Sequence, residues 1–104
     1  MERQRISTGS PWENIVGYSR AVRVGQMVFV AGTTASGPDG QILYPGDAYR
    51  QTRAILERIG AALHEVGAEF GDVVQTRVYV RDIRRWEEIG RAHGDVFREF
   101  RPVT

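Results

Sequence analysis

Histidine and acidic side chains are the first residues in this sequence that could do acid–base or metal chemistry. His64 begins the string HEVGA, which starts like the helical metal motif of zinc proteases, but Ala68 stands where the second histidine should be. His93 and Asp95 offer two ligands without a third, and His93 falls on an apolar stripe. We therefore expect His64 at a solvated helix edge, His93 as a partly buried core or interface histidine, and no metal site.

Several catalytic motifs are incomplete or absent. The stretch GTTASG has the glycine spacing of a phosphate-binding loop, but it continues into Pro38 and Asp39 instead of lysine and a hydroxyl residue. No Gly-x-Ser-x-Gly elbow of a serine hydrolase occurs. The sequence has no cysteine, and all 14 basic residues are arginine. Thiol nucleophiles, thiolate metal sites and lysine Schiff bases are therefore excluded.

A backbone bend and an aromatic hydroxyl remain as candidates for ligand contact. The apolar run ending in FVAG leads directly into Gly32, Thr33 and Thr34, and a glycine at a strand end lets a ligand or another chain approach the backbone. An ordinary strand end is an equally good interpretation. Tyr18 precedes a predicted strand, where its hydroxyl could line a pocket, although a tyrosine that only caps the sheet is the more common case.

Length and composition favour one soluble domain. The chain has 104 residues, of which 41% are hydrophobic and 26% charged, and its net charge is +1. This charge is too small to indicate a nucleic-acid-binding protein. No apolar run approaches the roughly 20 residues of a membrane span, and the charged start lacks the apolar core of a signal peptide. We expect a cytoplasmic protein without a nucleic-acid or membrane partner.

The first half of the chain predicts strands and turns that would position Tyr18 and the bend. Residues 1–17 are expected to form a loop or a weak first strand. Residues 21–24 and 27–30 predict a hairpin around a turn at 25–26, and 39–40 predict a second turn. The unbroken apolar run at 27–30 indicates a strand that is covered on both faces or lies inside a barrel.

The second half predicts two helices and one further strand. Asp47 is expected to cap a helix whose apolar positions share one face, and Gly67 to end it. Residues 74–81 alternate between apolar and polar side chains, which predicts a half-buried strand. A second helix is expected after Asp82. The order predicts an α+β fold, an antiparallel-rich mixed sheet with two helices on one face, although three strands are few for two helices.

Five stretches in order carry a resemblance to a known family. They are GYSRAVRVGQMVFVAGTT, PDGQI, GDAYRQTRAILERIGAAL, DVVQTRVYVRDI and WEEIGRAHGDVF. Across residues 17–104 the chain resembles the Rid family of reactive-intermediate deaminases, also called YjgF/YER057c/UK114 and formerly endoribonuclease L-PSP. The resemblance implies one domain over residues 1–104, a chorismate-mutase-like fold, and a homotrimer with clefts between its subunits. It also implies hydrolysis of 2-imino or 2-enamino acids to 2-keto acids and ammonia, without cofactor or metal.

The resemblance also implies a set of substrate-binding residues, while leaving the catalytic residues unknown. Three of them depart from the family pattern. Ala31 replaces a serine, Gly90 replaces an asparagine, and Thr104 replaces the arginine that holds the substrate carboxylate in a Pro-x-Arg motif. An arginine fork donates charged hydrogen bonds, whereas a threonine offers one neutral hydrogen bond. The full set is Tyr18, Ala31, Gly32, Thr33, Gly90, Val103 and Thr104.

These departures leave three functions open. We favour a Rid-type hydrolase of imines, enamines or related metabolites over a trimer that binds small ligands without catalysis. A ribonuclease or translation-inhibitor role is disfavoured by the weak net charge. Residues 102–104 are expected to begin a strand, because family members continue with further strands that we expect to be missing here. Arg101 is not expected to replace the family arginine, since an extended strand would turn it to the opposite side from Thr104.

Overall fold

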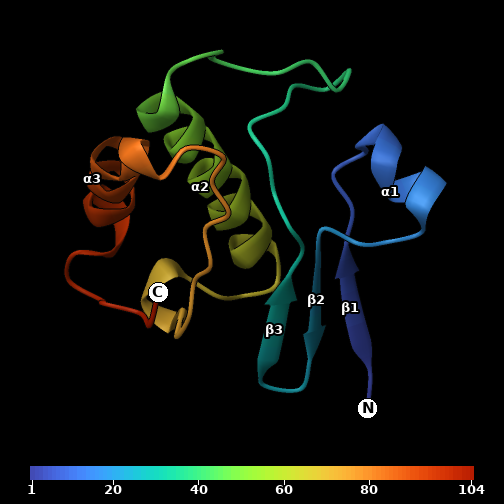
Figure 1. The fold of residues 1–104 in the computed structure, drawn as a ribbon. Coiled ribbons are helices and arrows are strands. Elements are labelled where there is room, and N and C mark those ends of the chain that lie inside the picture. Colours follow the sequence, from blue (N-terminus) through green and yellow to red (C-terminus); the bar gives the residue numbers. More distant parts are fainter.

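An antiparallel sheet of three short strands forms one side of the molecule in the computed structural model, which describes residues 1–104 (Figure 1). The strands β1 (Arg3–Ile6), β2 (Ala21–Val24) and β3 (Met27–Val30) lie in the order β1-β2-β3. Val24 pairs with Met27, so Gly25 and Gln26 form a two-residue turn, and Gly25 has the positive φ of +59° that such a turn requires. The predicted hairpin is confirmed, and of the two alternatives for the start of the chain, loop or weak strand, residues 3–6 form the strand.

The helix α1 (Pro11–Val16) lies between β1 and β2, in a region that the sequence predicts as loop or strand. Pro11 and Gly17 are turn-forming residues, which explains that prediction. Here the same residues begin and end a short helix. Proline fits the first helical position, because its missing N–H would have no partner there. Gly17 adopts a left-handed conformation at φ +83°, and its N–H donates to the carbonyl of Glu13.

The long helix α2 (Ala48–Glu65) covers one face of the sheet and forms the core with it. Ala62 and Val66, at its C-terminal end, pack with Ile6 of β1 and Ala21 of β2, and all four are at least 93% buried. As predicted, the Asp47 side chain accepts a hydrogen bond from the Arg50 N–H. Gly67 also has the predicted left-handed conformation, with φ +79°. α2 therefore ties the three strands into one unit.

Replacing Asp47 with alanine is expected to lower the free energy of unfolding by about 1 kcal/mol, because an amide at the start of α2 loses its acceptor. Urea unfolding followed by circular dichroism measures this change. Asp39→Ala, in an exposed turn, is the matched control and is expected to change stability by less than about 0.5 kcal/mol. Equal effects of the two substitutions would contradict the capping role.

The helix α3 (Trp86–Phe97) packs along α2 and follows the short 3-10 helix η2 (Ile83–Arg85) (Figure 1). Its buried Phe97 meets the Phe70 ring edge-on, with 5.4 Å between ring centroids, and the His93 ring at 4.6 Å. Phe70 belongs to a second 3-10 helix, η1 (Phe70–Asp72). The two predicted helices are confirmed. None of the helices is long and apolar enough to cross a membrane.

Residues 74–81 do not form the strand that their alternation predicts. The segment makes a single parallel bridge, between Gln75 and Val103, and no regular ladder. A strand needs a hydrogen-bonded neighbour along its length, and beyond this bridge the segment has none. Its side chains are accordingly open on both sides, with Tyr79 88% and Val80 39% exposed. The bridge does agree with the expectation that residues 102–104 begin a strand.

The sheet is covered on one face only within a single chain. Val28 and Val30 pack against the core beneath α2. Met27 and Phe29 alternate with them and are 61% and 58% exposed. The coverage of both faces predicted for residues 27–30 is therefore not achieved inside one chain. Exposed apolar side chains on a sheet are typical of a surface that contacts another protein.

Candidate functional site

Arg20, immediately before β2, connects Tyr18 with the bend that follows β3. One terminal nitrogen, Nη1, donates to the Gly32 carbonyl at 2.7 Å and to the Thr33 hydroxyl at 3.0 Å. The other, Nη2, donates to the Tyr18 hydroxyl at 3.2 Å. The structure thus brings together the predicted site residues Tyr18, Gly32 and Thr33, with Ala31 leading into the bend. The residue that joins them is one that the sequence analysis does not select.

The counter-ion of Arg20 is Glu13 of α1. The two charged groups lie 3.6 Å apart, and each side chain is only 3% exposed. The Ser7 hydroxyl donates to one carboxylate oxygen of Glu13 at 2.9 Å, and Thr8 donates through its N–H at 3.1 Å and its hydroxyl at 2.5 Å. Buried charges are stable only when they are paired and hydrogen-bonded. The Glu13 carboxylate meets that requirement, whereas Arg20 has its two terminal nitrogens bonded but its Nε buried without a hydrogen-bond partner.

The hydrogen bonds around Glu13 outweigh its burial. Burial is the largest single influence and raises the pKa of this carboxyl group. The donors from Thr8 and Ser7 and the nearby charge of Arg20 act in the opposite direction, and together they hold the pKa below its usual value of 4.5. Glu13 is therefore ionised at neutral pH, and the Glu13–Arg20 pair has no net charge.

The bend presents backbone donors that the fold does not use. The Thr33 hydroxyl accepts from Arg20 and donates its hydrogen to the Ala31 carbonyl at 2.9 Å, so it has no hydrogen left to donate to a ligand. By contrast, the backbone N–H groups of Gly32 and Thr33 have no partner within the chain. Gly32 is exposed, and a Cβ atom added there would meet no atom within 4 Å. Free N–H groups at an open bend can donate to an oxygen that gains negative charge during a reaction.

Arg58 of α2 adds an unneutralised positive charge to this region. Its Nη1 donates to the Thr34 carbonyl at 2.7 Å and to the Ser36 hydroxyl at 3.3 Å, and no carboxylate lies within 4 Å of its guanidinium group. Burial lowers the pKa of Arg58, and the charge of Arg20 lowers it further. Since Glu13 neutralises Arg20, the positive charge of Arg58 remains available to attract an anionic ligand.

The other predicted site residues form a second group near the C-terminus. The Thr104 hydroxyl lies 2.9 Å from the Thr76 hydroxyl, which lies 2.9 Å from Nε2 of His93. Val103 is in the bridge to Gln75, and Gly90 is exposed on α3. No hydrogen bond or ion pair joins these residues to Tyr18, and Figure 1 shows the C-terminus beside η1, away from α1. Within one chain the predicted set is therefore two groups.

The histidines behave as their sequence context predicts. His93 is partly buried against Phe97, and this burial lowers its pKa, so its ring is neutral at pH 7. His64 is exposed on α2. No group of three or more histidine, aspartate or glutamate side chains is close enough to hold a metal ion.

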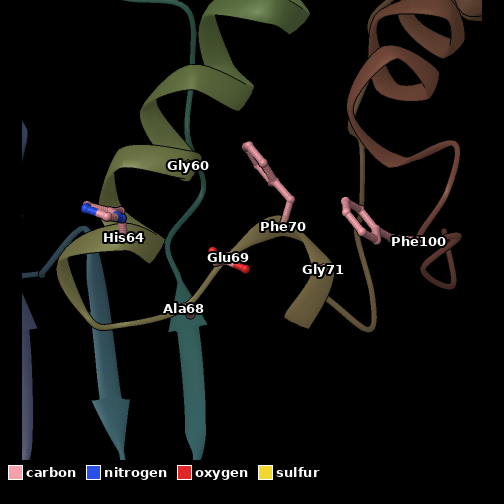
Figure 2. Close-up of a pocket in the computed structure, with 7 residues that line it drawn as sticks. All are labelled: Gly60, His64, Ala68, Glu69, Phe70, Gly71 and Phe100. Atoms are coloured by element: carbon pink, nitrogen blue, oxygen red, sulfur yellow. The ribbon is translucent and has the colours of Figure 1, made fainter.

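Two surface hollows lie near the C-terminal segment. Figure 2 shows the larger, of about 330 Å³, with the rings of Phe70 and Phe100 at its side and His64 directed away from them. It is lined by Gly60, His64, Ala68, Glu69, Phe70, Gly71 and Phe100. The smaller, of about 240 Å³, is lined by His93, Gly94, Phe97, Arg98, Arg101 and Pro102. None of the predicted substrate-binding residues lines either hollow, so we retain the region around Tyr18 and Gly32 as the candidate site.

Sequence reasoning missed Glu13, Arg20 and Arg58 because each stands in a pattern that has a simpler interpretation. Arg20 precedes a strand and Arg58 lies in an amphipathic helix, where charged residues are usually solvated. The available signal was the hydroxyl pair Ser7–Thr8 a few residues before Glu13. Hydroxyl donors close to an acid are able to satisfy a buried carboxylate.

Comparisons with known proteins agree with this fold. Residues 8–104 match the family model described as Endoribonuclease L-PSP. An uncharacterized protein of Streptomyces coelicolor is 42% identical over 97% of this chain and 75% of its own length. The 2-iminobutanoate/2-iminopropanoate deaminase of Rattus norvegicus is 29% identical over 92% of this chain and 70% of its own length. A crystal structure from Mycobacterium tuberculosis, of a YjgF/YER057c/UK114 family member, has a TM-score of 0.88 at 50% identity and covers 99% of this chain and 80% of that one.

Proposed function

Because the chain belongs to the endoribonuclease L-PSP family, also called YjgF/YER057c/UK114, and has its chorismate-mutase-like α+β fold, we propose that it hydrolyses small 2-imino or 2-enamino acids. Water adds to the electrophilic carbon of the imine, the carbon–nitrogen bond breaks, and a 2-keto acid and ammonia leave. The observation that carries this proposal is the cluster around Arg20. It places the Tyr18 hydroxyl next to the bend at Gly32, whose N–H groups have no other partner.

The chemistry of this cluster suits the reaction. When water adds to the imine carbon, the electron pair of the C=N bond moves to the nitrogen, and donors at the bend can hydrogen-bond the group that gains this charge. Donors fixed in advance are the most effective ones. Arg58 supplies positive charge for an acidic substrate. The rat relative is named for the deamination of two such acids, which supports the same substrate class here. The proposal requires no cofactor or metal.

A homotrimer with clefts between subunits is part of the proposal. Two features support it. The apolar side chains of Met27 and Phe29 are exposed on the open face of the sheet, where a neighbouring subunit would cover them. The predicted residues also fall into two separate groups in one chain, as expected if Gly90, Val103 and Thr104 of one subunit face Tyr18 of the next. We further propose that the protein is cytoplasmic. Residues 1–104 are proposed to form a single domain, and further strands are proposed to complete its sheet.

A trimer that binds small ligands without catalysis is the second candidate. Thr104 favours it, because this residue stands at the position of the family arginine and its hydroxyl already contacts Thr76. With a neutral hydroxyl there, the carboxylate of a substrate loses its strongest expected partner.

The proposed reaction is expected to appear as ammonia release from freshly generated 2-iminobutanoate, at a rate proportional to protein concentration. The imine is formed in the assay from 2-aminobutanoate by an amino-acid oxidase, and the spontaneous rate in buffer is subtracted. Heat-denatured protein is the control. If the rate does not exceed the spontaneous one while the protein binds the stable product 2-oxobutanoate, the second candidate is correct and the enzymatic one is wrong.

A further inference from the structure

Arg20 is held by its main chain and by both terminal nitrogens of its side chain, while its buried Nε has no hydrogen-bond partner. Its backbone N–H donates to the Ile6 carbonyl of β1 at 2.7 Å, and its carbonyl accepts from the Ala31 N–H at 2.9 Å. Its side chain is 97% buried, and the guanidinium group contacts Glu13 as well as Tyr18 and Gly32. Both main chain and side chain are therefore fixed before any ligand arrives, and such a residue can orient its neighbours.

The chemistry of arginine determines the direction of the hydrogen bond to Tyr18. A guanidinium group has five N–H donors and no acceptor. The Tyr18 oxygen must therefore accept from Nη2 of Arg20, and the hydroxyl hydrogen has to point elsewhere. The Tyr18 hydroxyl donates no hydrogen bond to another group of the chain. The Tyr18 hydroxyl is consequently left as a free donor.

The same guanidinium group fixes the bend. Nη1 holds the Gly32 carbonyl at 2.7 Å, which restrains the peptide plane between Gly32 and Thr33. The backbone N–H groups of Gly32 and Thr33 then remain without protein partners. The Thr33 hydroxyl does not donate to a ligand, because its hydrogen is bonded to the Ala31 carbonyl. The Thr33 side chain connects Arg20 to the end of β3.

We propose that Arg20 is a positioning residue that aims the Tyr18 hydroxyl hydrogen at a bound small keto or imino acid and fixes the bend at Gly32 beside it. The free donor of Tyr18 and the positive charge of Arg58 suit the acidic ligands of the proposed function. This inference takes its ligand from the proposed function and adds that Arg20 orients the groups that bind this ligand. Glu13 neutralises Arg20, so that Arg20 acts through geometry and not through net charge.

A double-mutant cycle tests this role. Arg20→Gln alone would leave the Glu13 carboxylate buried without a counter-ion and could prevent folding, so both charges are removed together in the paired variant Glu13→Gln/Arg20→Gln. Tyr18→Phe is then made in the wild-type and in the paired background. The readouts are kcat/KM for 2-iminobutanoate and the Kd of 2-oxobutanoate measured by calorimetry.

In the wild-type background, Tyr18→Phe is expected to weaken 2-oxobutanoate binding and kcat/KM by about 10-fold to 100-fold, the usual range for a hydrogen bond to a charged or polarised group. In the paired background, Tyr18→Phe is expected to change the Kd and kcat/KM by less than about 3-fold. The Tyr18 hydroxyl is no longer oriented there, so the effects of the two changes are coupled. The matched control pair is Arg85→Gln at the end of η2 with Glu88→Gln on α3, which removes a half-exposed ion pair elsewhere and should leave the full Tyr18 effect. Equal Tyr18 effects in the wild-type and paired backgrounds would overturn the proposal.

Two further readouts separate this inference from the proposed reaction. If wild-type protein binds 2-oxobutanoate but releases no ammonia, the enzymatic proposal fails and the cycle is completed on Kd alone. In ligand-free protein, the guanidinium N–H signals of Arg20 are expected to appear in NMR spectra as slowly exchanging peaks that shift in Tyr18→Phe. Unshifted signals would overturn the contact itself. Arg20→Lys is expected to lose 2-oxobutanoate affinity despite keeping the positive charge. One ammonium group cannot contact both Tyr18 and Gly32 as the fork of arginine does.

Discussion

Replacing Glu13 with glutamine is expected to destabilise the protein by about 3–5 kcal/mol, because it leaves the buried guanidinium group of Arg20 without a counter-ion. Urea unfolding measures the change. The paired variant Glu13→Gln/Arg20→Gln is the sharpest comparison, since it removes both charges and is expected to recover most of the lost stability. A single variant as stable as the wild type would show that the ion pair contributes nothing.

The dependence of this loss on pH identifies its cause. The folded-state pKa of Glu13 lies below its usual value of 4.5, so the ionised carboxylate stabilises the fold fully above that value. The contribution disappears as pH falls through the lower, folded-state pKa. The difference in unfolding free energy between wild type and Glu13→Gln is therefore expected to be constant near neutral pH and to shrink below about pH 4.5. A difference independent of pH down to 2 would point to altered packing instead.

Replacing Thr104 with arginine is expected to raise kcat/KM for 2-imino acids by at least about 10-fold, because hydrogen bonds to charged groups contribute more than neutral ones. The Thr104 hydroxyl contacts the Thr76 hydroxyl at the surface, so its removal should lower the free energy of unfolding only slightly. The measurement is the ammonia-release assay, with a charged imino acid compared with its neutral amide. Only the acid is expected to gain.

Thr104→Gln is the matched control, since it has similar length but no charge and should give little or no increase. An equal increase for acid and amide would indicate a general effect on the site and not carboxylate recognition. If the wild type is a binding protein without turnover, the same arginine is expected to tighten 2-oxobutanoate binding by a comparable factor.

Local patterns were sufficient for the elements with strong start and stop signals. The hairpin turn at Gly25 and the ends of α2 at Asp47 and Gly67 each depend on one residue with a special conformation or cap, and such residues are visible in a sequence. Residues 74–81 show the opposite case. Their alternation is genuine, but a strand also needs a neighbour, and alternation does not show whether a neighbour is present.

The candidate site likewise contains residues that could be selected from the sequence and residues that could not. Tyr18, Gly32 and Thr33 were selected as candidates from a glycine bend at a strand end, an aromatic hydroxyl and the family resemblance, and the structure brings them together. Arg20 was not found, because burial of a charged side chain depends on a partner that lies on another element. Glu13 is that partner, and it lies on a helix that the sequence did not predict. Buried ion pairs are a tertiary property, and a local pattern does not record them.

The hydrogen bonds of Glu13 also bear on where this domain begins. The match to the family model starts at residue 8, but the folded unit extends further towards the N-terminus. Ser7 holds the Glu13 carboxylate, the Ile6 carbonyl accepts from Arg20, and the whole of β1 pairs with β2. A protein trimmed to the family boundary would therefore keep Tyr18, Gly32 and Thr33 and lose part of the support that orients them.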